Sequence, residues 1–552
     1  MDLNAVIAGK HDVYFMFPEG TIRANWFQFA PAEIELGCFD IAVEVLEWNP
    51  AVTSLIIELN EPATQTAVAA MNIEVHAKTS ATIAGAGLTA GEAVYDGPRT
   101  VTNKYVSEAP GGAPSENGSY IVVELKHGFN NTLAQVDGCS AAYYPTRNFL
   151  LDLAYSVKLD GIALAQRNII YEWEGLFDLV PNPVDGFTSQ NYRMAAPGQY
   201  MGTGPDGGAP YPLVLWNQGG GETYLWNAAV GTGNEGSQLF ANMGGTGWLK
   251  NAPEAAYILA PQRGAGVNEP GYSHQGVMAF INDLIDEGLV DPNRVYVAGP
   301  SAGGAETHTY LRTYPNGFAA AIPICAGAQN AEQVELFKRV PVWYVHADND
   351  NPQNSLTSYN NLRNAGSTVA RRTNFAAVAD GIRPAAWGNT PRYQLGSVFG
   401  PHLVPSDDYV DAQGHQFRYY ADGHWSWIMV LNNIKPSDAP VAPQYTTVGS
   451  ENDTFMGWLF AQVRPPVPAP VTSLRIDALP ITTVERGGEY KFNLILNENA
   501  AGDFVWTLGD TSFGSVDADG KVTIFDRTGN VRLTVTDILS GISHSITLRV
   551  AS

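Results

Sequence analysis

Along the first 175 residues, apolar and polar positions alternate in short stretches that Gly, Pro and Asn separate. Alternation with a period of two is typical of strands that bury one face. The clearest stretches are SLIIELN (54–60), MNIEVHAKT (71–79), SYIVVELKHG (119–128) and FLLDLAYSVKLDG (149–161). We therefore predict a β-sandwich over residues 1–175.

Between residues 176 and 463 the pattern changes, and continuous apolar runs alternate with helical periods. Such runs are typical of strands that are buried on both faces of a mostly parallel sheet. The runs are PLVLWNQ (212–218), AAYILAPQ (255–262), RVYVAG (294–299), AAAIPIC (319–325) and VPVWYVHA (340–347). Residues 176–463 are therefore predicted to form an α/β domain.

One helix of that domain is visible in its apolar spacing. The stretch HQGVMAFINDLIDEGL (274–289) places five apolar side chains on one helical face: Val277, Phe280, Ile281, Leu284 and Ile285. Gly288 is expected to end the helix, and DPN (291–293) is expected to turn the chain into the strand at 294–299.

A proline-rich stretch, RPPVPAPV (464–471), follows and predicts a stiff linker, because proline cannot continue a helix or a central strand. Residues 472–552 then return to alternating strands: YKFNLILN, DFVWTLGD, KVTIFD, VRLTVTD and HSITLRV. DADG (517–520) is interpreted as a hairpin turn, since no Glu follows at the spacing of a calcium loop. We predict a second all-β sandwich here.

Composition and charge limit the partners. The 552 residues suit three or four domains, and 45% hydrophobic residues indicate a globular chain. The net charge of −24 opposes binding to nucleic acid or anionic lipid. No apolar run approaches the roughly 20 residues of a membrane helix. We expect neither nucleic acid nor a membrane span among the partners.

Three cysteines are too few for a disulfide scaffold, and no CxxC spacing predicts zinc. Cys38 and Cys139 can pair in an oxidising compartment, which the sequence alone leaves open. The N-terminus MDLNAVIAGKHDVYF shows no signal peptide. Either the protein is cytosolic, or this is a mature form that has lost its signal.

The candidate chemistry centres on VYVAGPSAGGAE (295–306), where a strand-like run breaks into small residues around Ser301. A strand, then Gly-x-Ser-x-Gly, then a helix is the nucleophile elbow, a turn so sharp that only glycine fits beside the serine. The Ala302 N–H at the helix start points toward a developing oxyanion. GGG (219–221), after another strand, predicts a second oxyanion donor from Gly220 or Gly221.

A nucleophilic serine needs a histidine base that a carboxylate orients. In this fold the acid and then the histidine follow the serine, each just after a strand. VPVWYVHA is followed by both Asp348 and Asp350, and QFRYYADGHWSW (416–427) offers His424. His308 lies on the helix after Ser301, beyond reach of its hydroxyl, and is interpreted as an ordinary helix residue. His402 and His415 precede the final strand and fit the template less well.

Residues 190–435 resemble α/β-hydrolase esterases of the polyhydroxybutyrate-depolymerase-like and feruloyl-esterase-like group. The resemblance rests on DPNRVYVAGPSAGGAETHTYLRTYPNGFAAAIPICAGA, followed by PVWYVHADNDNP and DGHWSW. It implies Ser301 as nucleophile, His424 as base and Asp350 as acid, because that family spaces His, three residues, then Asp. His346 is the marker of that spacing. Gln218 stands where the family usually has His.

Two further features extend the resemblance. An immunoglobulin-like domain ahead of the hydrolase is also seen in that group, and the C-terminal stretch resembles bacterial immunoglobulin-like (group 2) modules, which commonly decorate secreted enzymes. We therefore expect an extracellular or periplasmic location. Residues 370–414, rich in Pro, Gly and aromatics, form an insertion that predicts either a lid or a surface excursion.

The leading hypothesis is a secreted serine carboxylesterase that needs no metal or organic cofactor and acts on a small-molecule or polymer ester. Gln218 and Trp425 are candidate substrate contacts. The sandwich domains leave polysaccharide or cell-surface contact open. Two alternatives remain: a prolyl-oligopeptidase-like serine peptidase, and a non-catalytic surface protein that binds carbohydrate or mediates adhesion. The sequence does not define the acyl or alcohol group.

Overall fold

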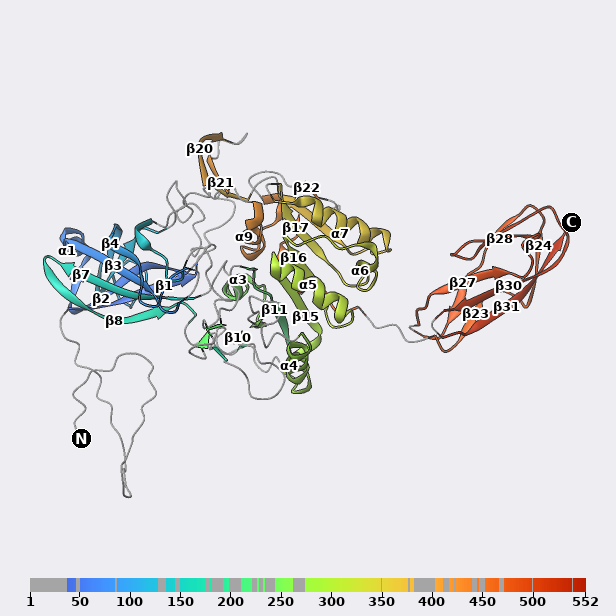
Figure 1. The fold of residues 1–552 in the computed structure, drawn as a ribbon, viewed down its shortest axis with the longest axis horizontal. Coiled ribbons are helices and arrows are strands. Elements are labelled where there is room, and N and C mark those ends of the chain that lie inside the picture. The colour runs from blue at the N-terminus through green and yellow to red at the C-terminus, as the bar shows by residue number, and fades with distance from the viewer. Residues whose placement is uncertain are drawn as a thin grey trace, which may run out of the picture. The chain divides into compact units, whose positions relative to one another are not determined.

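Strand-forming stretches at the N-terminus assemble as one eight-stranded sheet in the computed structural model, in the order β4-β3-β7-β8-β1-β2-β6-β5 (Figure 1). Alternation along β7 places every second side chain in the core. The strands are β1 (Cys38–Val45), β2 (Pro50–Thr64), β3 (Ile73–Ala81), β4 (Ala93–Arg99), β5 (Val101–Ser107), β6 (Asn117–Leu125), β7 (Leu151–Leu159) and β8 (Ile162–Tyr171). A short helix, α1 (Gln65–Ala70), follows β2.

The structure describes residues 37–45, 50–84, 87–127, 136–143, 149–173, 179–180, 192–197, 210–220, 226–227, 232–233, 244–261, 274–348, 350–375, 378–381, 403–410, 416–420, 423–438, 444–445, 452–465, 471–498, 500–538 and 540–552.

The α/β domain contains a nine-stranded sheet in the order β22-β18-β17-β16-β15-β11-β14-β10-β9. Its six central strands, from β14 to β18, pair in parallel, as predicted. The strands are β9 (Leu179–Val180), β10 (Tyr192–Ala195), β11 (Tyr211–Trp216), β14 (Tyr257–Pro261), β15 (Val290–Pro300), β16 (Ala320–Ile324), β17 (Trp343–Ala347), β18 (Arg371–Phe375) and β22 (Gln444–Tyr445). Both faces are covered, because Leu213 and Leu215 of β11 enter one core and Val214 and Trp216 the other.

Helices connect these strands, and Figure 1 shows α5, α6 and α7 together along β15 to β17. The helices are α3 (Gly244–Asn251), α4 (His274–Asp286), α5 (Ala302–Thr313), α6 (Ala331–Glu335), α7 (Pro352–Asn364), α9 (Trp427–Leu431) and α10 (Phe455–Phe460). In α4, the side chains of Val277, Ile281 and Leu284 are buried, which confirms the predicted apolar face. Gly288 has φ of +73° just after this helix.

Two local predictions are wrong. The DPN stretch (291–293) lies within β15 rather than ahead of it, as an irregular segment where the register with β11 shifts and the N–H of Asn293 donates to Oδ1 of Asp291 at 2.8 Å. The central sheet also takes residues 371–375 as β18, so the insertion is shorter than expected. Beyond it lies a separate small sheet of β19 (Ala379–Gly381), β21 (Gln416–Tyr420) and β20 (Leu403–Val410). A further hairpin joins β12 (Trp226–Asn227) to β13 (Thr232–Gly233).

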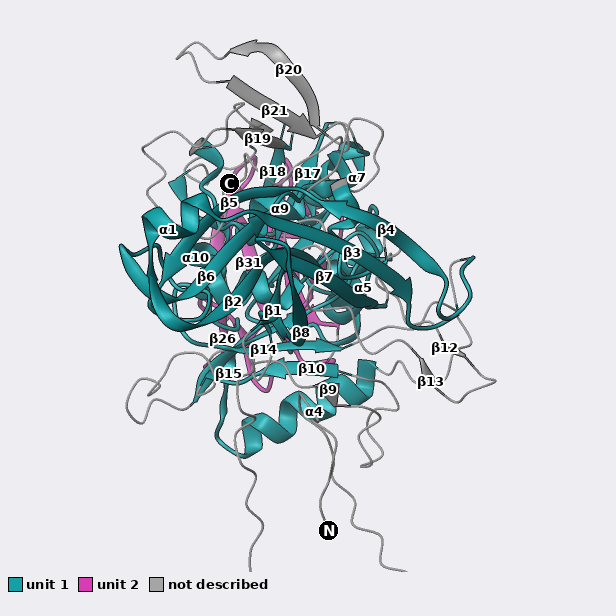
Figure 2. Ribbon diagram, turned by 90° about the vertical axis from the view of Figure 1, so that its left-hand side faces the viewer, with its two compact units in different colours: residues 1–465 teal, residues 466–552 magenta. Residues whose placement is uncertain are grey.

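The chain divides into two compact units, residues 1–465 and 466–552 (Figure 2). The second unit is all β and has its own core, which includes Ile476, Val522, Leu533 and Leu548. Its strands are β23 (Leu474–Ile476), β24 (Ile481–Glu485), β25 (Glu489–Lys491), β26 (Leu494–Leu496), β27 (Phe504–Leu508), β28 (Gly514–Val516), β29 (Lys521–Ile524), β30 (Gly529–Asp537) and β31 (Ser543–Ala551). YKFNLILN forms two strands in different sheets rather than one. DADG connects β28 to β29 as a hairpin turn, as predicted.

Candidate active site

Ser301 is the single residue between the end of β15 at Pro300 and the start of α5 at Ala302. Its backbone has φ of 55° and ψ of −115°. Positive φ is uncommon for a residue with a side chain, and it persists only where the surroundings enforce it. The turn therefore has the strained geometry of the predicted nucleophile elbow.

The glycines on either side of Ser301 are required by close backbone contacts. A Cβ added to Gly303 would lie 2.2 Å from the carbonyl oxygen of Asn217, and one added to Gly299 would lie 2.6 Å from the same oxygen. A Cβ on Gly304 would lie 2.7 Å from that of Ala326. The oxygen that Gly299 and Gly303 would meet belongs to the backbone and cannot rotate away. Only glycine at these two positions therefore allows β11, β15 and α5 to approach this closely.

The elbow is also fixed to the neighbouring strand, β16. The backbone N–H of Ser301 donates to the carbonyl oxygen of Ile324 at 2.9 Å and to Sγ of Cys325 at 3.2 Å. Because this N–H already has partners within the protein, an oxyanion must obtain its donors elsewhere. The predicted donors are the backbone N–H groups of Ala302 and of the glycine loop after β11.

The structure brings two of the predicted oxyanion residues together. Gly220 follows β11, and a Cβ at Gly220 would lie 3.8 Å from the Cβ of Ala302 at the start of α5. The first turn of a helix has unpaired N–H groups and a partial positive charge, both of which favour an anion. Gly221 lies outside the described residues. Ala302 and Gly220 therefore lie close enough together for both to be candidate oxyanion donors.

The acid and base candidates meet although they are 74 positions apart. The Nδ1–H of His424 donates to Oδ2 of Asp350 at 2.9 Å. Asp350 lies just after β17, and His424 lies in a single helical turn (Gly423–Trp425) that follows β21. His346, the last but one residue of β17, places its Nε2 3.0 Å from the same carboxylate oxygen. Asp350 is thus held between two imidazoles.

The competing acid, Asp348, has a different partner. Its Oδ1 accepts a hydrogen bond from the side-chain amide of Asn374 on β18. Of the two carboxylates that follow β17, Asp350 is the one in contact with the histidine.

Electrostatics at this pair follow from the contacts. Burial alone would raise the pKa of Asp350, but hydrogen bonds from His346 and His424 outweigh it and hold the pKa below its ordinary value. The hydrogen bonds to Asp350 and Cys325 raise the pKa of His424, although burial opposes this. The pair therefore favours a carboxylate that stabilises an imidazolium, as a triad acid does.

Cys325 belongs to the site, and the sequence analysis missed it. This residue comes directly after β16, has a positive φ of 41° and is buried. Its sulfur accepts a hydrogen bond from the backbone N–H of Ser301, and its side chain is also hydrogen-bonded to His424. Burial raises the pKa of the thiol, which therefore stays protonated at neutral pH. One signal was available: Cys325 ends a buried run next to the nucleophile strand, where parallel strands present their site residues.

The remaining predicted residues lie as follows. Gln218 and Trp425, candidate substrate contacts, are both buried, and Trp425 stacks on Trp427. His308 is also buried, which lowers its pKa to about 3, and it contacts apolar rings rather than the serine. His402 and His415 lie outside the described residues. Cys38, Cys139 and Cys325 form no disulfide with one another, so the pairing of Cys38 with Cys139 that the sequence left open is not seen.

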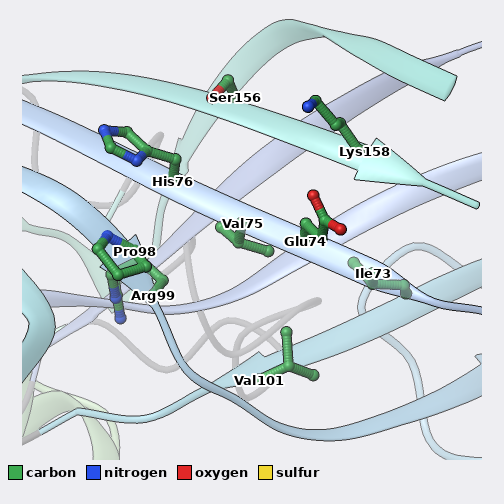
Figure 3. Close-up of a pocket in the computed structure, with 9 residues that line it drawn as sticks. All are labelled: Ile73, Glu74, Val75, His76, Pro98, Arg99, Val101, Ser156 and Lys158. Atoms are coloured by element: carbon green, nitrogen blue, oxygen red, sulfur yellow. The ribbon is translucent and has the colours of Figure 1, made fainter. Parts of the chain in front are cut away.

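A cavity of about 600 Å³ lies on the N-terminal sandwich, apart from these residues. Figure 3 shows His76 and Glu74 of β3 beside Ser156 and Lys158 of β7, which are cross-strand neighbours in the sheet. Arg99 of β4 also lines it. None of the residues of the candidate active site borders this cavity.

Two family models match parts of the chain. The model of the esterase Ig-like N-terminal domain matches residues 39–165, and the model of the prolyl oligopeptidase family matches residues 268–375. The chain thus has an esterase-type Ig-like domain followed by an α/β-hydrolase domain, which confirms these two parts of the predicted fold. Among the described residues, no helix is long and apolar enough to span a membrane.

Two individual proteins are similar to this chain, one in structure and one in sequence. A solved structure of a thermostable esterase covers 77% of this chain and 99% of its own length, with a TM-score of 0.50 and 21% identity. This likeness shows that the fold is shared. Poly(3-hydroxyalkanoate) depolymerase C of Paucimonas lemoignei is 38% identical over 85 residues, which are 13% of this chain and 20% of the depolymerase. The match thus spans about a fifth of that relative.

Proposed function

We propose that this protein is a secreted serine carboxylesterase with Ser301 as nucleophile, His424 as base and Asp350 as acid. The observation that carries the proposal is the hydrogen bond between His424 and Asp350, which orients an imidazole near a strained serine elbow. Cys325 contacts both the Ser301 amide and His424, so the two halves of the site are adjacent.

In the proposed reaction, Oγ of Ser301 attacks the ester carbonyl carbon while Nε2 of His424 takes the hydroxyl proton. Asp350 holds the ring through Nδ1–H and stabilises the imidazolium. The N–H groups of Ala302 and Gly220 stabilise the oxyanion of the tetrahedral intermediate. His424 then gives its proton to the leaving alcohol. A water molecule, deprotonated by His424, hydrolyses the acyl-enzyme and regenerates Ser301.

The test is hydrolysis of p-nitrophenyl acetate, butyrate and octanoate by the purified protein and by Ser301→Ala. We expect the folded variant to lose at least about a thousandfold in rate. The ratio of rates across the three chain lengths then gives the length of the acyl pocket. Equal rates for both proteins would contradict the assignment of the nucleophile.

A serine peptidase is the second candidate, because the prolyl oligopeptidase family model matches residues 268–375. The same triad serves either reaction, so the substrate decides. An N-blocked prolyl p-nitroanilide tested beside the p-nitrophenyl esters separates the two, since only a peptidase cleaves the anilide amide at a comparable rate. Activity on neither substrate class would favour the non-catalytic binding protein.

A further inference from the structure

A thiol stands inside the candidate active site. Sγ of Cys325, a ring nitrogen of His424 and a carboxylate oxygen of Asp350 all lie within 4.8 Å of one another. The proposed hydrolysis uses His424 and Asp350 but requires no chemistry from sulfur. These three side chains therefore form a potential ligand set that the proposed hydrolysis does not use in full.

Sulfur, imidazole nitrogen and carboxylate oxygen form a donor set that Zn²⁺ accepts, with metal–ligand distances of about 2.0–2.3 Å. Ligands at such distances lie a few ångströms apart in a tetrahedral site, so donors within 4.8 Å of one another need only small movements to converge. Thiolate softness favours Zn²⁺ and Cd²⁺ over Mg²⁺ or Ca²⁺, which prefer oxygen ligands.

The three donors differ in their exposure. The side chains of His424 and Asp350 are 37% and 20% exposed, whereas Cys325 is 6% exposed. Solvent therefore reaches the imidazole and the carboxylate, and the thiol closes the inner side of the group. Cys325 is also held in position by the N–H of Ser301, which donates to its Sγ.

We propose that Cys325, His424 and Asp350 form a reversible binding site for a thiophilic divalent cation, with Zn²⁺ as the type ligand, and that the bound ion inhibits the enzyme. The inhibition rests on the proposed serine hydrolase function, whereas the metal site itself does not. Binding forms a bond between the metal and Sγ, and the thiol proton leaves to solvent. Zn²⁺ is neither oxidised nor reduced.

The existing contacts explain why such a site opposes catalysis. Asp350 accepts a hydrogen bond from His424, and metal binding to both side chains competes with that bond. A histidine whose lone pair is bound to metal can no longer take the proton of Ser301. One ion would thus remove the base and its orienting acid from the reaction.

The test uses the full-length protein after EDTA treatment and dialysis, with Zn²⁺ titrated against p-nitrophenyl butyrate hydrolysis. Cys325→Ser keeps the size of the side chain but removes the soft ligand, and Cys38→Ser is the matched control at another free cysteine. We expect the concentration for half-inhibition to rise at least about tenfold in Cys325→Ser. Cys38→Ser and Mg²⁺ should change nothing. Equal inhibition of Cys325→Ser and the parent protein would overturn the proposal.

A readout that needs no activity separates this proposal from the esterase function. In the Ser301→Ala background, Cd²⁺ binding should produce thiolate-to-metal charge-transfer absorbance that Cys325→Ser abolishes and Cys38→Ser retains. If Cys325→Ser does not fold, X-ray absorption spectroscopy of Zn²⁺ on the parent protein replaces it. A Zn²⁺ coordination shell that contains one sulfur atom supports the site, and a coordination shell of nitrogen and oxygen atoms alone refutes it.

Discussion

The two halves of the candidate site are built in different ways. The serine elbow comes from six consecutive residues, 299–304, and its shape is enforced by backbone contacts with β11 and β16. The acid–base pair joins the end of β17 to a turn that follows a separate small sheet, and one hydrogen bond connects its members. Backbone packing thus fixes the position of the candidate nucleophile, whereas polar contacts fix that of the candidate base. The two halves should respond differently to substitution.

The largest effect is expected from the polar half. Asp350→Asn keeps the shape of the side chain but loses the charge that orients and stabilises protonated His424. We expect kcat for p-nitrophenyl esters to fall about 10⁴-fold, with little loss of thermal stability. Asp348→Asn is the matched control, because that carboxylate contacts Asn374 instead. A larger loss in Asp348→Asn would reverse the assignment of the acid.

A smaller loss of activity, together with a loss of stability, is expected from the packed half. In Gly303→Ala the new Cβ would lie 2.2 Å from a backbone oxygen, so β11 and α5 must separate. A displacement of about 1 Å costs on the order of 10²-fold in rate, and overpacking costs about 1–3 kcal/mol of unfolding free energy.

Gly327→Ala is the control for this change, since a Cβ there meets nothing within 4 Å. Urea unfolding and ester hydrolysis are measured on both variants. If Gly303→Ala and Gly327→Ala have the same unfolding free energy and the same hydrolysis rate, the elbow does not depend on glycine at position 303.

The smallest expected effect is a shift in the pH dependence of ester hydrolysis. His424 must be neutral to accept a proton, and its pKa is raised by Asp350. Activity of the EDTA-treated protein should therefore fall as pH drops through a midpoint above the ordinary histidine value of about 6.5. In Asp350→Asn the main cause of the rise is gone, so the midpoint should move to lower pH. A midpoint unchanged by Asp350→Asn would mean that another group controls it.

The same difference explains how much could be predicted from sequence. The elbow and the buried strands depend on local residues, so VYVAGPSAGGAE and the apolar runs were sufficient to predict them. Asp350 needed the family spacing of His346, since both acids follow the same strand. Cys325 was not predicted: its place at the end of a buried run was the available signal, but the packing of β16 against β15 is what places its thiol beside Ser301.

The strand before His424 was predicted, but its sheet was not: β21 joins β19 and β20 in a small separate sheet rather than the central sheet. β20 and β21 are consecutive along the chain, whereas β19 pairs with β21 across a long interval, and residues 370–414 show no regular apolar period. The DPN stretch was expected ahead of the strand at 294–299, but it lies within β15, where residues 291–293 pair with no described residue of β11 and the N–H of Asn293 donates to Oδ1 of Asp291.

The separate core of residues 466–552 has a thermodynamic consequence. A chain whose compact units bury their apolar side chains independently need not melt in one cooperative step. Calorimetry should then give more than one heat-absorption peak, and inactivation should follow only the peak of residues 1–465. A single melting temperature would then describe the heat stability of this protein incompletely.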